Sequence, residues 1–346
     1  MQALVSILIP AYNAGATIAD AVGSALTQTW PFKEVVVVDD GSKDRTLSIA
    51  RRCASGDVTV VTQSNKGAAA ARNLAYSLCQ GNYIQWLDAD DLLAPDKIAM
   101  QMQALDHCSS NRVLLSSAWG RFMYRYRKAR FSPTLLWGDL SPVEWLLRKM
   151  RHSLFMPTST WLVSRELTEA VGPWNNGLVT DDDGEYFCRV ILASDGTRFV
   201  PESKTFYRSS GSSRLSYIGQ SKRKMEAQFE SMKLQIGYFR SAEDSERVRT
   251  ACLNYLKTWL IFFYPERPDI VEQAEQLAAA LGGQLGVPRL RWKYAWLQGV
   301  FGYGLAKRAQ FSVPELKDSF IRACDKALFY LESHNLSNHL PIQKRK

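Results

Sequence analysis

Four short apolar runs alternate with helical segments in the first ninety residues, and this alternation constrains the fold more than any other feature of the chain. The runs are rich in β-branched residues and read as buried strands at 4–9, 34–38, 58–61 and 83–87. Helical periodicity follows the first three, at 14–28, 44–53 and 68–79. Such alternation favours right-handed βαβ crossovers. The sequence therefore predicts an α/β fold with a mainly parallel sheet flanked by helices.

The fourth predicted strand ends in a dense group of carboxylates. Asp88, Asp90 and Asp91 follow Leu87 directly, so they fall at the carboxyl end of the strand, where open α/β sheets bind ligands. Like charges this close repel one another unless a cation or a hydrogen-bonding ligand satisfies them. A divalent ion shared with a diphosphate would do so. Solvated aspartates that cap the helix opened by Pro95 are an equally good reading of these residues alone.

Polar loops also leave the first two strands. Residues 10–13 (Pro-Ala-Tyr-Asn) follow the first strand and residues 39–42 (Asp-Asp-Gly-Ser) the second, so three polar loops converge on one edge of the sheet. A dinucleotide-binding domain would need the pattern GxGxxG in its first turn, and Pro10–Gly15 lacks it. Asp39 can accept a hydrogen bond from a nucleobase imide N–H, or it can cap the following helix.

Further charged residues fit a sugar-diphosphate site. Asp88 is a candidate to bind a ribose hydroxyl, and Asp90 is a candidate to bind a divalent ion. Lys66 and Arg72 either add positive charge near this site or are ordinary surface cations. A second acidic run, Asp181–Asp183, begins a helix predicted to reach Ala193. Its last carboxylate is a candidate general base for an acceptor hydroxyl, although acidic residues also stabilise helix N-termini.

Later segments show weaker patterns. The sequence predicts a long strand or strand pair at 112–126 and short strands at 160–164, 198–200 and 205–208. Helices are expected at 95–107, 143–149, 165–171 and 184–193. After Tyr217 strand signals vanish, and helical periodicity appears at 222–240, 246–264, 271–281 and 314–332.

Charge and cysteine usage narrow the class of protein. The 346 residues include 43 Lys and Arg against 34 Asp and Glu, a net charge of +9 that favours an anionic partner. The six cysteines stand far apart without a CxxC pair, so neither a zinc site nor a disulfide framework is indicated. The first apolar run is too short for a signal sequence or a membrane span. A cytoplasmic location is expected. No recognised nucleic-acid module accompanies the basic stretches, so no nucleic-acid partner is expected.

Successive segments of the chain resemble the signature segments of family 2 glycosyltransferases with the GT-A fold. They are PAYN at 10–13, VDDGSKD at 38–44, NKG at 65–67 followed by ARN at 71–73, and LDADD at 87–91. The resemblance covers about residues 4–216. It implies inverting, metal-dependent transfer of a sugar from a nucleotide-activated donor.

The resemblance also implies roles for individual residues. Nucleotide-sugar binding falls to Pro10, Tyr12, Asn13, Asp39, Lys66, Gly67, Arg72, Asp88 and Asp90. Among these, Asp39 would read the base and Asp90 would be the ligand of Mn²⁺ or Mg²⁺. Residues 182–189 (DDGEYFCR) are similar to the acidic pair and aromatic-rich helix of the family, which assigns the general base to Asp183, with Asp182 as the fallback.

One position departs from the pattern of the family. Members often carry Tyr-Arg-x-His after the late strand, with a histidine that completes the metal shell, whereas Tyr207-Arg208-Ser209 is followed here by Ser210. A hydroxyl is a poor substitute for imidazole, so metal binding would depend more on the donor diphosphate and water. The loop 209–216, which includes Arg214, either closes over the diphosphate or is a plain surface loop.

These observations define the expected organisation and function. Residues 1–216 form the catalytic domain, with a nucleotide-sugar half at 1–110 and an acceptor half at 111–216, and residues 217–346 form a helical C-terminal region. The expected reaction moves a sugar, from a UDP-sugar by preference, to a hydroxyl of a saccharide or lipid-linked saccharide. The alternatives are an inactive nucleotide-sugar-binding protein and a sugar nucleotidyltransferase, the latter disfavoured because 10–15 is not a glycine- and lysine-rich loop.

An aromatic stretch suggests a membrane contact. No acidic residue occurs between Gln276 and Pro314, and cations flank the aromatic residues of 292–303. Residues 286–311 are therefore expected either to lie at the inner face of the membrane as an amphipathic segment or to pack on the catalytic domain.

Overall fold

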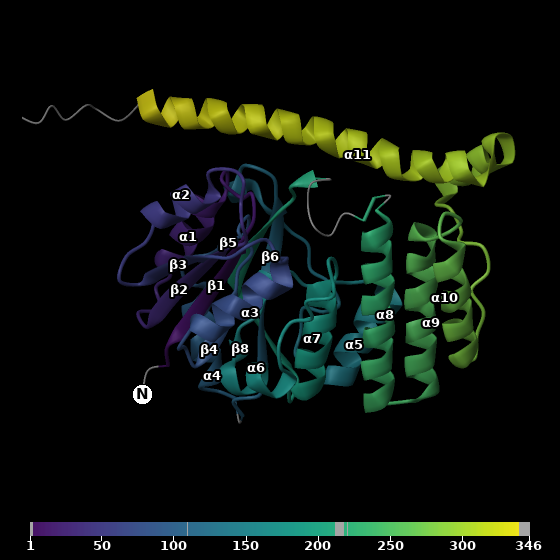
Figure 1. Ribbon diagram of the computed structural model, residues 1–346, viewed down its shortest axis with the longest axis horizontal. Helices are drawn as coiled ribbons and strands as arrows, with labels where there is room; N and C mark the ends of the chain where they lie inside the picture. The colour runs from purple at the N-terminus through teal and green to yellow at the C-terminus, as the bar shows by residue number, and fades with distance from the viewer. Residues whose placement is uncertain (1–2, 109, 212–217, 220, 339–346) are drawn as a thin grey trace, which may run out of the picture. The chain divides into compact units, whose positions relative to one another are not determined.

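The first sheet is built from the predicted alternation. The computed structural model describes residues 3–108, 110–211, 218–219 and 221–338. Its larger sheet has the strand order β3-β2-β1-β4-β8, in which the first four strands run parallel and β8 antiparallel (Figure 1). The strands are β1 (Val5–Ala11), β2 (Lys33–Asp39), β3 (Val58–Thr62), β4 (Tyr83–Trp86) and β8 (Val163–Ser164).

Alternating side chains of the central strands serve two separate cores. Ile7, Ile9 and Val37 pack with α1 (Ile18–Leu26) and α2 (Thr46–Arg52). Leu8 and Val36, one residue out of phase, pack with α3 (Ala68–Leu78) in the other core. Because strand side chains point to opposite faces in turn, continuous apolar runs become strands covered on both faces. The predicted α/β fold is confirmed.

A second sheet follows in the chain. It has the order β5-β9-β6-β7, with β5 antiparallel to β9, and its strands are β5 (Leu92–Leu93), β9 (Thr197–Arg208), β6 (Leu114–Phe122) and β7 (Arg130–Phe131). The two predicted strands at 198–200 and 205–208 are one strand. Pro201 lies between them, outside the stretch of β9 that pairs with β5, at Thr205 and Phe206.

Helices surround these sheets in the larger of two compact units. That unit comprises residues 1–120, 131–207 and 218–288. The remaining helices of this unit are α4 (Lys97–Leu105), α5 (Pro142–His152), α6 (Arg165–Val171), α7 (Asp182–Ala193), α8 (Lys222–Ala242), α9 (Glu246–Trp259) and α10 (Pro268–Ala280). Short 3₁₀ turns occupy Thr158–Thr160 and Leu260–Phe262 in this unit and Tyr126–Lys128 in the other unit. The strand predicted at 160–164 is thus reduced to β8, because the chain turns at Thr158–Thr160 before it joins β4.

The boundary predicted near residue 217 does not coincide with the division between the compact units. Helices α8 to α10 form as the periodicity predicted, but they share the apolar core of α5, α7 and β4. The reason is that Phe229, Ile236 and Tyr255 are fully buried in that core. The division of residues 1–216 into donor and acceptor halves remains a prediction.

The second unit combines a long helix with two short segments, and comprises residues 121–130, 208–217 and 289–346. Its helix α11 (Trp292–Asn338) contains a break at Gly302, where φ is 76° and ψ is 166°. Pro314, expected to open a helix, lies inside α11. Within the unit, Asp325 and Glu332 both pair with Arg125 at 2.8 Å. Over the described residues, no helix has a stretch long and apolar enough to cross a bilayer.

Candidate active site

Three loops leave the same edge of the parallel sheet. In the register of β1 and β2, Ala11 lies opposite Asp39, and the Asp40 amide donates to the Ala11 carbonyl at 2.8 Å. The loops then bind each other, since the Asn13 amide donates to Ser42 Oγ and the Lys43 amide to Asn13 Oδ1. The side-chain oxygen of Asn13 is thus used within the protein. Tyr12, beside it, is exposed.

Asp39 presents one unused acceptor inside this edge. Its side chain is 1% exposed, and its Oδ2 accepts from the Thr62 hydroxyl at 3.0 Å and from the Ser42 amide at 3.3 Å. Its Oδ1 is buried and has no partner among the described residues. A buried acceptor without a donor is costly unless a ligand supplies one. This atom therefore marks a position where a bound N–H or O–H group would be stabilised.

Asp40 shapes the neighbouring loop rather than facing a ligand. Its carboxylate accepts from the Lys66 and Gly67 amides, both at 2.8 Å, and from the Gln63 side chain at 2.7 Å. The loop passes so near that a Cβ on Gly41, whose φ is +70°, would lie 2.8 Å from the Asn65 amide nitrogen. Lys66 is held through its backbone while its ammonium group stays exposed.

Arg72 joins the two acidic runs. Its side chain is 6% exposed, with Nη2 at 2.8 Å from Asp88 Oδ1 and Nη1 at 2.6 Å from Asp182 Oδ2. Burial alone would lower the pKa of Arg72, but the carboxylates of Asp182 and Asp88 raise it above its usual value. The guanidinium also lies 4.4 Å from the ring centroid of Trp174, which stacks on Tyr186 at 4.0 Å. A buried arginine between two carboxylates fixes their separation.

The three carboxylates that begin α7 have different surroundings. Asp181 accepts three side-chain hydrogen bonds from α8, and Asp182 binds Arg72 of α3. Asp183 accepts only the amide of Gly184 among the described residues. It is partly exposed, so it keeps acceptor capacity for a ligand.

The surroundings also change the acidity of Asp183. Burial raises its pKa to about 7, with the neighbouring charges of Asp182 and Asp181 adding to the increase and Arg72 opposing it. A carboxylate with a pKa near neutrality is a stronger base than an ordinary aspartate. The geometry and the charge therefore both suit Asp183 to proton abstraction.

The acidic run after β4 is divided in a similar way. Asp91 is fully buried and accepts from the Ser159 hydroxyl at 3.1 Å. Asp88 keeps 31% of its side chain exposed beside Arg72, and Asp90 is partly exposed. Among the described residues, no three acidic, cysteine or histidine side chains gather as a metal site. These carboxylates fit a cation that takes most of its oxygen ligands from a substrate diphosphate and water, as Mg²⁺ commonly does.

The structure thus brings together most of the predicted residues. Pro10 lies in β1 and pairs with Val38 of β2. The same edge of the sheet is surrounded by five further predicted residues: Asp39, Lys66, Gly67, Arg72 and Asp88. Arg214 lies outside the described residues. Ser210 belongs to the second unit, where its carbonyl accepts from Arg322 at 3.1 Å.

Sequence reasoning missed Trp174 and the polar side chains of α8. Trp174 lies between α6 and α7, and its ring is in contact with the guanidinium of Arg72. The residues of α8 that bind Asp181 are Gln228, Ser231 and Gln235, spaced three and four residues apart. Their signal was a stripe of uncharged polar residues at helical spacing on α8, which also carries a buried apolar face.

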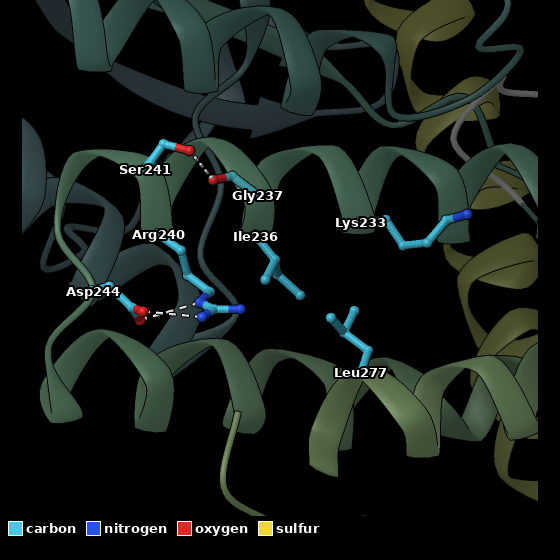
Figure 2. Close-up of a pocket in the computed structure, with 7 residues that line it drawn as sticks. All are labelled: Lys233, Ile236, Gly237, Arg240, Ser241, Asp244 and Leu277. Atoms are coloured by element: carbon cyan, nitrogen blue, oxygen red, sulfur yellow. Dashed lines mark hydrogen bonds and ion pairs between the residues drawn. The ribbon is translucent and has the colours of Figure 1, made fainter. Parts of the chain in front are cut away.

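A groove between α8 and α10 is a separate feature. It encloses about 330 Å³ and is lined by Lys233, Ile236, Gly237, Arg240, Ser241, Asp244 and Leu277 (Figure 2). Its charged side chains have partners: Arg240 binds Asp244 at 3.0 Å, and Lys233 binds Glu230 at 2.6 Å. None of the candidate site residues lines it, so it is not the candidate active site.

The fold is of the GT-A class. Staphylococcus aureus TarS (residues 1–349, in complex with UDP-GlcNAc) matches with a TM-score of 0.66 and 18% identity, over 88% of this chain and 91% of that one. The Pyrobaculum calidifontis mannosyltransferase PcManGT, in complex with GDP-Man and Mn²⁺, matches with a TM-score of 0.51 and 20% identity, over 98% and 89%. At such identities the likeness concerns the fold alone.

Sequence comparisons point to a family of glycosyltransferases. Residues 6–172, just under half of the chain, match the model of Glycosyl transferase family 2. Chondroitin synthase of Escherichia coli is 46% identical over 99 residues, which are 28% of this chain and 14% of that protein. An uncharacterized glycosyltransferase of Rickettsia conorii is 35% identical over 198 residues, which are 54% of this chain and 31% of that protein. The chain thus spans less than a third of the length of these two relatives.

Proposed function

We propose that the protein is an inverting glycosyltransferase that moves a sugar from a nucleotide diphosphate, by preference UDP, to a hydroxyl of a saccharide or lipid-linked saccharide. The observation that carries the proposal is the position of Arg72. It bonds at once to Asp88, in the run that would hold the donor, and to Asp182, next to the candidate base. Residues 94 positions apart in the chain therefore meet around one cation, as transfer between a bound donor and an activated acceptor requires.

The donor base is proposed to bind at Asp39. Its unpartnered Oδ1 suits the imide N–H of uracil, which thymine and guanine also carry. Cytosine and adenine present acceptors at the corresponding ring nitrogens, and an acceptor there would face the carboxylate oxygen without a hydrogen bond. The family relationship supports a nucleotide-sugar donor, and the fold neighbours TarS and PcManGT were solved with UDP-GlcNAc and GDP-Man.

Asp90, together with the donor diphosphate, is proposed to hold Mn²⁺ or Mg²⁺. A divalent cation there would neutralise the charge that develops on the departing diphosphate. Asp88 would contact the ribose or the cation with the oxygen that Arg72 does not use. Lys66, Gly67 and the first loop, with Pro10, Tyr12 and Asn13, would complete the donor pocket.

Asp183 is proposed as the general base. Its carboxylate takes the proton of the acceptor hydroxyl while the hydroxyl oxygen bonds to the anomeric carbon. The bond between that carbon and the phosphate oxygen breaks, and the nucleoside diphosphate leaves from the opposite face, so the configuration inverts. Asp182 is less suited to this role because Arg72 already occupies its Oδ2.

A nucleotide-release assay tests the proposal. Wild-type protein is mixed with UDP-, GDP- and dTDP-sugars, candidate acceptors, and Mn²⁺ or Mg²⁺, with Asp183→Asn as the matched control. Release from a UDP-sugar in the wild type but not in the control supports transfer. Tight donor binding without release from any sugar would favour the inactive binding protein. Formation of a nucleotide sugar from a sugar phosphate would favour the nucleotidyltransferase.

A binding experiment tests the donor base separately. Calorimetry should show that the wild type binds UDP more tightly than CDP, since of the two bases only uracil has a ring N3–H to donate to Asp39. Asp39→Ala should lose this preference, at a cost of about 1–3 kcal/mol in UDP binding. Equal affinity of the wild type for both nucleotides would remove Asp39 from base recognition.

A membrane contact through residues 286–311 is also part of the proposal. Trp292 is 83% exposed and Trp296 64% exposed, in a stretch without acidic residues. Exposed indoles beside lysine and arginine suit the surface of an anionic bilayer, where a lipid-linked acceptor would be found.

Vesicle co-sedimentation tests this contact. Anionic phosphatidylglycerol vesicles should retain the protein at low salt and release it at high salt, while neutral phosphatidylcholine vesicles should not retain it. Replacing both tryptophans by alanine should abolish retention, whereas Phe32→Ala, which removes an exposed aromatic ring elsewhere, should not. Absence of salt-sensitive binding would refute the membrane contact.

A further inference from the structure

Asp181 adopts an unusual backbone conformation immediately before the candidate base. Its φ is 53° and its ψ is 26°, in the left-handed region, and α7 begins at the next residue. This conformation is unfavourable for residues other than glycine, although aspartate tolerates it better than most. Because only Asp182 separates Asp181 from Asp183, the turn at Asp181 sets the direction in which the Asp183 side chain leaves the backbone.

The carboxylate of Asp181 is held by a stripe of polar side chains on α8. Its Oδ2 accepts from Gln228 Nε2 at 3.1 Å and Gln235 Nε2 at 2.8 Å, and it lies 2.7 Å from the Ser231 hydroxyl. That hydroxyl also lies 2.9 Å from the Asp181 carbonyl oxygen. All three α8 side chains are buried, so water does not compete for these bonds.

A close approach on the other side restricts the same turn. A Cβ on Gly184 would lie 2.3 Å from Asp181 Oδ1, so only glycine fits while the carboxylate keeps this position. Gly184 directly follows Asp183 and donates its amide to Asp183 Oδ1 at 2.9 Å. The Asp181 carboxylate is thus fitted between α8 and the residue that contacts the base.

We propose that Asp181, together with Gln228, Ser231 and Gln235, is a positioning cluster that fixes the orientation of Asp183 for proton transfer. The inference rests on the proposed role of Asp183 and extends it to helix α8. These α8 residues lie outside residues 6–172, the part of the chain that matches the family model. The cluster acts through the backbone turn and through the charge of Asp181; none of its members touches the reacting atoms.

The charge of Asp181 gives the cluster a measurable signature. Asp183 is faced by Asp182 and Asp181 from its own segment, and by Arg72 and Asp88 from α3 and the loop after β4. Asp181 itself is faced by Lys149 on α5, Cys188 on α7 and Tyr255 on α9. The negative charge of Asp181 helps to raise the pKa of Asp183. Neutralising Asp181 should therefore lower that pKa, which a purely structural residue would not do.

Three variants separate orientation from charge. Asp181→Asn keeps the shape and tolerates the left-handed conformation but removes the charge. We expect kcat to fall roughly ten- to a hundredfold with little change in donor KM, and the acidic limb of kcat/KM to move to lower pH. Ser231→Ala should lower kcat about threefold without moving the limb. Ser241→Ala, on the same helix and exposed, is the matched control and should change neither.

The outcomes decide the proposal. If folded Asp181→Asn keeps the wild-type kcat and an unmoved acidic limb, the positioning cluster is refuted. If the wild type itself transfers no sugar, the proposed function fails. The positioning cluster can then still be tested by measuring protein stability instead of activity. The pH dependence of the difference in unfolding free energy between the parent and Asp183→Asn reports the pKa of Asp183. That pKa should be lower in the Asp181→Asn background, and an unchanged value would again refute the cluster.

Discussion

The two acidic runs of the molecule, Asp88–Asp91 and Asp181–Asp183, are alike in composition and alike in the way the fold divides them. In each run one carboxylate is committed to the protein interior, Asp91 with Ser159 and Asp181 with α8. In each, one carboxylate binds Arg72. The third, Asp90 or Asp183, is partly exposed. The first run continues a strand of the sheet, whereas the second begins a helix.

This difference in position explains the different roles proposed for the two exposed carboxylates. Asp90 follows the edge of a parallel sheet, where backbone loops already supply polar groups for a nucleotide. Asp183 stands beside two other acidic residues at the start of α7, and burial together with their charges raises its pKa to about 7. The same residue type is therefore suited to a cation in one run and to a proton in the other.

The largest effect is expected when Asp183, in the second acidic run, is replaced. Asp183→Asn should lower kcat by roughly 10²- to 10⁴-fold, because a positioned general base contributes about that much. Nucleotide affinity, measured by calorimetry, should stay close to that of the wild type. Asp182→Asn should cost less activity. If Asp182→Asn were inactive and Asp183→Asn active, the assignment of the two residues would be reversed.

In the first acidic run, the informative substitution is at Asp90. Asp90→Asn should reduce transfer about a hundredfold or more and weaken its dependence on Mn²⁺ concentration, since a cation contributes several kcal/mol of charge stabilisation at the departing diphosphate. Asp91→Asn is the comparison. It should destabilise the fold by about 1–3 kcal/mol through its buried partner Ser159 while leaving the metal response unchanged. A metal titration unchanged in Asp90→Asn would count against Asp90 as the ligand.

The link between the runs is tested at Arg72. Arg72→Met leaves Asp88 and Asp182 without their shared cation and should destabilise the protein by about 3–5 kcal/mol in urea unfolding. Arg72→Lys keeps the charge but reaches only one carboxylate at a time, so an intermediate loss is expected. Were Arg72→Met as stable and as active as the wild type, the two runs would not depend on this residue.

The smallest expected effect is the dependence of activity and stability on pH. With a pKa of about 7, Asp183 should be deprotonated only above neutrality, so kcat/KM should fall tenfold per pH unit on the acidic side. The stability of the fold should change with pH in the opposite direction to the activity. A carboxyl whose pKa is higher in the folded state stabilises the fold at low pH and loses that contribution as the pH rises to about 7. Unfolding of Asp183→Asn should lack this pH dependence.

The sequence predicted the elements that local patterns determine. The four parallel strands and the first three helices were found close to their actual bounds, because continuous apolar runs and helical periodicity are local signals. Their order also indicated that Asp39 and Asp88 share one edge. The identities of the candidate site residues were therefore available before the structure was known.

The contacts that distinguish the three carboxylates of α7 were not available in this way. Gln235 lies 54 residues after Asp181, and no local rule connects a polar stripe on α8 with that turn. Trp174 sits in a short turn whose own pattern says nothing about a guanidinium above its ring. Likewise, the merged strand β9 depends on which residues pair with β5. Each of these features is determined by tertiary packing.

The hydrogen bonds of Asp40 have a consequence for the energetics of an arriving ligand. Because Asp40 already fixes the Lys66 and Gly67 amides, the loop gives up its conformational freedom when the chain folds rather than when a nucleotide docks. Affinity gained in this manner comes at the expense of fold stability. Attempts to re-engineer the selectivity of this loop should therefore retain Asp40 and vary only the side chains it does not restrain.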